Sequence, residues 1–218
     1  MTVAPPLVRN AARSREQLLD AAESVFAQKG YEATSLQEVG LKAGLSRGAP
    51  GYFFGSKADL YQAVLERSSA EALEAVRTGR ARALASGEPA ERVLTGTVAD
   101  YFDFFATRPH FVRLIEWEAL SDARYLASPP PHIRVAQEAL AAMSAELGLG
   151  PAQSDEARQL LLSIISLCWF PLAHGNTVLR ALGIDPTDPA FLERRKHHVV
   201  SLVLNGVRSG EAGVRSAP

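Results

Sequence analysis

The chain has 218 residues, of which 47% are hydrophobic and 22% charged, and its net charge at pH 7 is −1. A chain of this size can bury a hydrophobic core and is typical of one or two soluble globular domains. The single cysteine, Cys168, excludes an internal disulfide framework and a cysteine-based zinc finger, and it agrees with a reducing compartment. We expect a cytoplasmic protein, since the first ten residues do not resemble a secretory signal.

The charge is unevenly distributed along the chain. Residues 1–57 carry seven basic and five acidic side chains, a net charge of +2, so the remaining residues carry −3. This small difference favours contact between the N-terminal segment and a polyanion.

The first predicted helix follows residues 1–12, which we expect to form a disordered arm. Ser14 is a candidate N-cap, and Gly30 is a typical stop signal. Apolar side chains between them recur at helical spacing, so one face of this helix is expected to be buried.

Two further short helices are predicted directly after it. Thr34 and Ser35 each precede a glutamine or glutamate by three residues, which is the capping-box pattern of a helix start. This second helix ends at Gly44, and a third, at residues 47–54, follows after a very short connection. Three short helices, the last two joined by a turn that contains glycine, are the layout of a helix-turn-helix.

The turn between the second and third helices also matches G-x-S-x-G, the nucleophile elbow of serine hydrolases, at Gly44, Ser46 and Gly48. That elbow requires a strand before the serine, whereas Ser46 follows a predicted helix, and no run of alternating β-branched residues predicts a sheet. We therefore interpret Ser46 as an N-cap. We expect no enzyme activity, catalytic residue or metal site, and a serine hydrolase built on Ser46 is the less favoured alternative.

The segment Ser14–Val64 resembles the DNA-binding domain of the TetR family of bacterial transcriptional regulators. The similarity runs without a gap through FAQKGY, through ATS at the start of the second helix, and through KAGLSRG and YFFGSK. The resemblance implies an all-α protein, with an N-terminal three-helix helix-turn-helix domain at residues 1–57 and a larger helical domain at 58–218. It also implies a homodimeric repressor that binds a palindromic operator in double-stranded DNA and releases it when a small hydrophobic effector binds to the larger domain.

The resemblance further implies which side chains meet DNA. Arg47 is the first candidate to read a base, because arginine bonds guanine in a bidentate manner that is worth about 1–3 kcal/mol of discrimination. Lys57 matches a phosphate contact at the head of the fourth helix, and Tyr52 is the next candidate aromatic contact where the family's usual tyrosine is Gly51. The full implied set of DNA-binding residues is Thr34, Ser35, Ser46, Arg47, Gly48, Ala49, Tyr52, Phe53 and Lys57.

Two more residues depart from the family pattern. Pro50, where an inward-packed leucine or phenylalanine is usual, predicts a late or tight start of the third helix, because proline cannot donate a helical hydrogen bond. Gly40 replaces a usual alanine in the second helix, at a propensity cost of about 1 kcal/mol. Both departures bear on the geometry with which the third helix reads DNA.

The rest of the chain is also predicted to be helical. The predicted segments are residues 56–84, 91–109, 110–122, 133–148, 157–175 and 191–207. The segment 157–175 is apolar on nearly all sides, but it is too interrupted for a membrane span, which needs about 20 residues. Its surface must be buried against its own domain and a partner. Together with residues 191–207, it matches the two helices through which the family dimerises.

The segments between residues 91 and 175 contain more aromatic and sulfur-bearing side chains than a minimal dimer needs. Such a composition suits a largely apolar pocket with a few polar groups, which would hold a drug-sized hydrophobic molecule. No cofactor is expected. The candidate effector-binding residues are Phe102, Phe105, Arg113, Trp117, Met143, Trp169 and His174. The alternative is that these side chains are ordinary core, in a helical DNA-binding protein that has no ligand.

Overall fold

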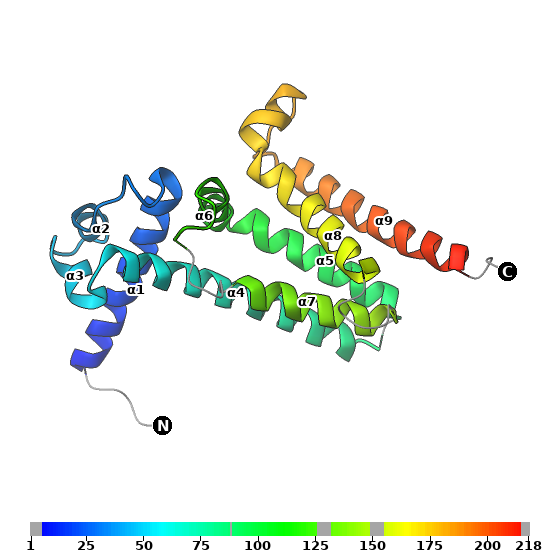
Figure 1. Cartoon of the computed structure of the whole chain (residues 1–218), viewed down its shortest axis with the longest axis horizontal. Coiled ribbons are helices and arrows are strands. Elements are labelled where there is room, and N and C mark those ends of the chain that lie inside the picture. Colours follow the sequence, from blue (N-terminus) through cyan, green and yellow to red (C-terminus); the bar gives the residue numbers. More distant parts are fainter. Residues whose placement is uncertain (1–5, 88, 126–131, 149–154, 215–218) are drawn as a thin grey trace. The chain divides into compact units, whose positions relative to one another are not determined.

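The computed structural model describes residues 6–87, 89–125, 132–148 and 155–214, and these residues form helices and connecting turns without a strand (Figure 1). The predicted all-α class is therefore confirmed. The chain divides into two compact units, the first made of Met1–Ala70 and His110–Pro131, the second of Glu71–Pro109 and His132–Pro218. The division differs from the predicted boundary at residue 57, because the long helix α4 (Lys57–Ala85) belongs to both units and a later segment returns to the first.

The first unit contains the predicted helix-turn-helix, the start of α4 and one later helix. Besides α4, its helices are α1 (Pro6–Lys29), α2 (Leu36–Lys42), α3 (Ala49–Phe54) and α6 (Pro109–Leu120). Its core is apolar, and Phe26 of α1, Val39 of α2, Leu60 of α4 and Leu114 of α6 are completely buried in it. Burial of this kind is the main source of the unit's stability.

Helix α1 begins earlier than the sequence predicted. Residues 6–12, expected to belong to a disordered arm, form its first turns, and residues 1–5 lie outside the described part of the chain. Pro6 starts the helix because proline fixes φ near the helical value and lacks only an N–H that has no partner in a first turn.

Helix α3 starts late, in agreement with the interpretation of Pro50. Gly48 is the N-cap and Pro50 lies in the first turn, where its missing N–H costs no hydrogen bond. Ser46 is therefore not the cap, because its carbonyl lies in the preceding turn and accepts a hydrogen bond from the N–H of Ala49 at 3.1 Å. Ser46 connects two helices, whereas a nucleophile elbow connects a strand to a helix.

Gly40 allows the close approach of α2 to the turn and to α3. An ideal Cβ at this position would lie 2.5 Å from the carbonyl oxygen of Ser46 and 3.2 Å from Cδ of Pro50. Non-bonded heavy atoms are most stable at about 3.5–4.0 Å, so any side chain here would push the turn away. Two of the three departures from the family pattern, Gly40 and Pro50, thus pack against each other.

The second unit is organised around α5 (Ala90–Thr107). Its other helices are α7 (His132–Leu147), α8 (Asp155–Ala173), the short π-helix η1 (Gly175–Leu179) and α9 (Pro189–Val214). Helix α5 packs against α7, α8 and α9, and α8 also packs against α9 (Figure 1). Cys168 is completely buried in this unit, and burial raises the pKa of its thiol to about 12, so it is not a nucleophile near neutral pH.

Pro171 lies inside α8 and removes one helical hydrogen bond, because proline has no N–H. The carbonyl that loses this partner is that of Leu167, four residues earlier, and Nη2 of Arg195 donates to it at 3.0 Å. Arg195 of α9 thus replaces the missing donor and joins α9 to α8. Among the residues with described positions, no helix combines the length and hydrophobicity that crossing a bilayer requires.

Candidate functional site

The candidate nucleic-acid interface lies on α3 and the turn before it. Arg47 is exposed in that turn, and the side chain of Tyr52 on α3 is 86% exposed. The ring of Phe53 packs edge-on against that of Tyr52, with centroids 5.2 Å apart. A Cβ at Gly51 would meet no atom within 4 Å, so the face beside Tyr52 is open. An exposed arginine just before a short helix and an exposed tyrosine on that helix can contact base edges and phosphates.

Ser35 and Thr34 differ in what their hydroxyl groups do. Ser35 is the N-cap of α2, its hydroxyl accepts a hydrogen bond from the N–H of Glu38 at 3.2 Å, and its side chain is exposed. Thr34 is only 3% exposed, and its hydroxyl donates to the carbonyl of Gly30 at 2.8 Å. Ser35 is therefore accessible to a phosphate, whereas the side chain of Thr34 holds the turn between α1 and α2.

Lys57 is bound to the same turn. Its Nζ donates to the carbonyls of Tyr31, Glu32 and Thr34 at 3.0, 3.2 and 3.1 Å, and it lies 4.4 Å from the ring centroid of Tyr31. A lysine ammonium has three N–H donors, and these bonds use all of them. Lys57 therefore fastens α4 to the α1–α2 turn in this structure.

Helix α6 packs against the helices of the DNA-binding part. The indole N–H of Trp117 donates to the carbonyl of Ala27 at 3.2 Å, and a Cβ at Gly30 would lie 3.0 Å from the indole ring. Buried Glu118 accepts a hydrogen bond from the hydroxyl of Tyr61 at 2.5 Å, and burial together with this bond raises the pKa of Tyr61. Trp117, predicted to bind the effector, is thus a packing residue of the first unit.

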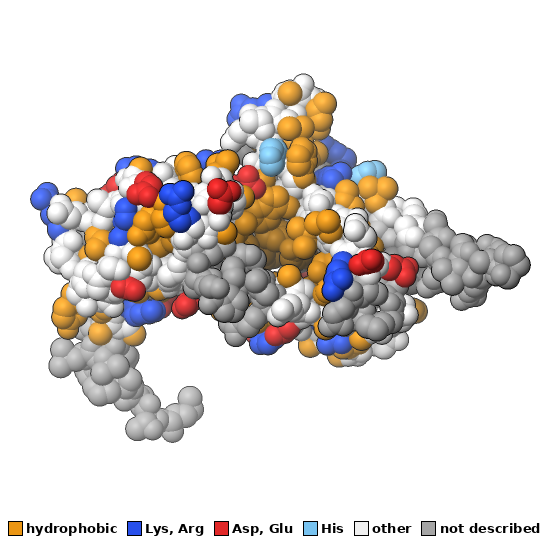
Figure 2. Space-filling view, in the orientation of Figure 1, with side chains coloured by type: hydrophobic (Ala, Val, Ile, Leu, Met, Phe, Trp, Pro, Cys, Tyr) orange, Lys and Arg blue, Asp and Glu red, His pale blue; other side chains and the backbone are white. Residues whose placement is uncertain are grey.

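Five of the seven predicted effector residues lie in the second unit, and four of them pack in or beside its core. Phe105 of α5 and Trp169 of α8 pack edge to face with centroids 5.1 Å apart, and Tyr101 packs on Phe105 at 4.5 Å. Phe102 and Met143 are only 1% and 6% exposed, so they are part of the core of α5 and α7. Figure 2 shows hydrophobic side chains in a hollow of the surface over α5, beside α8.

Of the two remaining predicted effector residues, His174 lies in the second unit and Arg113 in the first. His174 stacks on Phe170 with centroids 4.6 Å apart, and its Nδ1 is buried without a hydrogen-bond partner. Arg113 is an exposed residue of α6, in the first unit. The seven predicted residues are therefore divided between the two units and do not line one described cavity.

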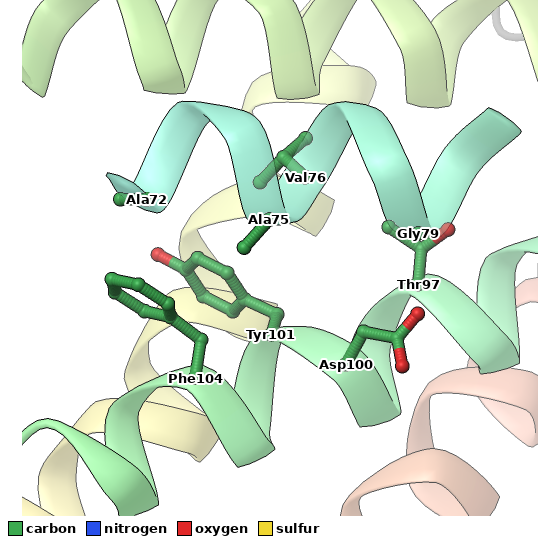
Figure 3. Close-up of a pocket in the computed structure, with 8 residues that line it drawn as sticks. All are labelled: Ala72, Ala75, Val76, Gly79, Thr97, Asp100, Tyr101 and Phe104. Carbon is green, nitrogen blue, oxygen red and sulfur yellow. The ribbon is translucent and has the colours of Figure 1, made fainter. Parts of the chain in front are cut away.

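A recess between α4 and α5 in the second unit involves residues that the sequence analysis did not select (Figure 3). Its volume is about 10 Å³, enough for about one water molecule. Figure 3 shows Tyr101 and Phe104 extending from α5 toward the small side chains of α4. The lining residues are Ala72, Ala75, Val76, Gly79, Thr97, Asp100, Tyr101 and Phe104. The helical spacing of the four α5 residues was the available signal, because it places them on one face.

One face of α8 and α9 carries exposed apolar side chains. Leu162 and Phe170 of α8 are 57% and 47% exposed, and Leu202 of α9 is 43% exposed. Leu162, Ser166 and Phe170 follow one another at intervals of four residues, which places them on the same side of α8. Leu202 lies on α9, which packs against α8, so both helices present exposed apolar side chains to solvent.

Comparison with known proteins agrees with this arrangement. Residues 18–64 match the family model for bacterial regulatory proteins of the tetR family, and residues 89–203 match the model for the tetracyclin repressor-like C-terminal domain. The transcriptional repressor Rv1474c of Mycobacterium tuberculosis is 30% identical over 90% of this chain and 94% of its own. The transcriptional repressor NicS of Pseudomonas putida is 27% identical over 92% of this chain and 95% of its own.

The fold is also found among solved structures. The transcriptional regulator SCO4942 from Streptomyces coelicolor superposes with a TM-score of 0.65, at 24% identity, over 87% of this chain and 96% of its own. At this identity the likeness shows a shared fold.

Proposed function

Because the chain belongs to the TetR family of bacterial transcriptional regulators, which bind specific DNA sequences, we propose that it is a cytoplasmic repressor that binds a palindromic operator as a homodimer. We also propose that a small hydrophobic effector releases it from DNA. The observation that carries the proposal is the exposed pair of Arg47 and Tyr52 at α3.

DNA reading is assigned to the N-terminal end of α3. Recognition helices of helix-turn-helix proteins contact base edges with their N-terminal residues, and Arg47 lies directly before that end. Ser35 at the start of α2 can hold a phosphate, because a helix N-terminus favours an anion. Tyr52 is available for a further backbone or base contact on the same helix.

Dimerisation is assigned to the exposed apolar face of α8 and α9. Pairing this face with the same face of a second copy would bury Leu162, Phe170 and Leu202 and would form a symmetric four-helix contact. Two reading helices related by a two-fold axis then address half-sites about 34–36 Å apart, or one turn of DNA.

Effector binding is assigned to the aromatic side chains of α5 and α8. A drug-sized ligand needs about 300–1,000 Å³, so the recess beside Tyr101 must widen, and α4 is the wall that has to move. Ion pairs join α4 to α5, between Arg82 and Asp100 and between Glu71 and Arg108. A molecule that binds better when α4 is displaced favours that state, and α4 continues into the DNA-binding unit. The small volume of the recess supports a second candidate function, that of a DNA-binding regulator that has no small-molecule effector.

The repressor proposal is tested by selection followed by transcription. The purified chain is used to select duplexes from a random pool, and the enriched site is placed in a promoter for transcription in vitro. We expect an inverted repeat and a fall in transcript as protein is added. An increase in transcript would identify an activator, and a pool without enrichment would reject sequence-specific binding.

The effector proposal needs a separate screen. Apolar metabolites that raise the melting temperature are tested for release of the selected duplex, with Trp169→Leu as the variant that should lose the response. Leu120→Ala, on an exposed residue of α6, is the matched control. If no compound releases DNA, the ligand-independent candidate is preferred.

A further inference from the structure

We propose that Arg15 of α1 binds a DNA phosphate beside α3, so that the interface extends beyond the helix-turn-helix; this inference rests on the proposed DNA binding. The guanidinium carbon of Arg15 lies 5.0 Å from the ring centroid of Phe54. Phe54 is the last residue of α3, whereas Arg47 precedes its first residue. Arg15 and Arg47 therefore mark the two ends of the reading helix.

The distance between these ends suits the spacing of a DNA backbone. Helix α3 has six residues, so it is about 9 Å long. Phosphates on one strand follow one another at about 3.4 Å along the axis. A cation at the far end of α3 therefore lies about 9 Å from the start of the helix, too far to contact the base that Arg47 reads.

The guanidinium of Arg15 is half exposed and forms a loose ion pair with Glu16, its neighbour in the chain. Lys29, Lys42, Lys57 and Arg67, by contrast, each donate a hydrogen bond within the described part of the first unit. The guanidinium of Arg15 lies 3.8 Å from the carboxylate of Glu16, beyond hydrogen-bond distance, and its side chain is 48% exposed.

The contact with Phe54 prepares Arg15 for a phosphate. A guanidinium that stacks on an aromatic ring uses its face, which leaves the N–H groups at its edge to donate. That edge matches two oxygens of a phosphate in a bidentate pair. The ring thus holds the cation in place and lowers the entropy lost when DNA binds.

The test compares Arg15→Gln with Arg13→Gln in the full chain. Both variants remove one exposed positive charge from α1, but residues two positions apart on a helix point in directions about 160° apart. Binding of the selected operator and of a scrambled duplex is titrated at salt concentrations from about 50 to about 200 mM. Arg15→Gln is expected to weaken binding to both duplexes equally and to reduce the slope of log K against log salt by about 0.9.

Two further results complete the test. Arg13→Gln is expected to keep the wild-type slope, and Arg15→Lys is expected to restore it, because lysine retains the charge. An unchanged slope in Arg15→Gln, with an unchanged or lowered melting temperature, would leave Arg15 a purely structural link between α1 and α3. Equal slopes in Arg13→Gln and Arg15→Gln, both below wild type, would show a general charge effect and overturn the contact. A wild-type chain that binds no duplex would reject the proposed function and this inference together.

Discussion

Arg47 is the residue on which sequence specificity depends in this account. Arg47→Ala should reduce the preference for the operator over scrambled DNA by about 1–3 kcal/mol, roughly 5- to 160-fold, because a bidentate contact to guanine is lost. Competition titrations of the two duplexes at one salt concentration measure this preference. If it does not change, base reading lies elsewhere, and Tyr52 is the next residue to substitute.

We expect Lys57 to contribute to stability rather than to DNA binding, because its ammonium group donates to three backbone carbonyls. Lys57→Met removes the donor to three carbonyls, so the free energy of unfolding should fall by about 1–3 kcal/mol while the salt slope of DNA binding stays unchanged. Urea unfolding and salt titrations measure the two quantities. Lys29→Met is the control, because its exposed ion pair with Glu38 is worth only about 0–1 kcal/mol. A lower salt slope in Lys57→Met would instead support the phosphate contact.

At the scale of elements, the fit between α2 and α3 depends on one glycine. Gly40→Ala should destabilise the protein by about 1–3 kcal/mol, because its Cβ would collide with the backbone of Ser46. Gly51→Ala, on the open side of α3, should stabilise it by up to about 1 kcal/mol through helix propensity. Urea unfolding of the two variants checks the opposite signs. A harmless Gly40→Ala would mean that the turn can relax away from α2.

The elements themselves were largely predictable, whereas their partners were not. Periodicity and caps located the helices, since Ser35 and Gly30 act locally and the buried face of a helix repeats along its own sequence. They did not show that Trp117 packs on Gly30, because that contact joins segments far apart in the chain. The sequence also did not show that Lys57 donates to backbone carbonyls, because these carbonyls are far from Lys57 in the chain. A lysine at that position is equally compatible with a phosphate contact.

The effector site was the least predictable part. Composition indicated an apolar region between residues 91 and 175, and Phe105 and Trp169 do meet there. Arg113 and Trp117 belong to the other unit, because the chain returns to it at α6. The spacing of residues along one helix does not show that a later helix packs in an earlier part of the fold.

For the whole molecule, binding to a palindromic operator requires that two chains associate, and we assign this contact to α8 and α9. Phe170→Glu should weaken the dimer, because it places a charge in the centre of a self-complementary apolar contact. Sedimentation at micromolar concentration should then show monomer, while wild type and Leu120→Glu, a change at an exposed residue of α6, stay dimeric. Monomeric wild-type protein would contradict the assignment of this face.

The most direct measurement is a titration of the wild-type chain, at one salt concentration, with three labelled duplexes. They are the selected palindrome, the same duplex with one half-site scrambled, and a fully scrambled duplex. We expect saturation at two chains per palindrome. The affinity for the palindrome should be at least about 10³-fold higher than for scrambled DNA, and the half-site duplex should have an intermediate affinity. Equal affinities for all three duplexes, within a few-fold, would contradict it.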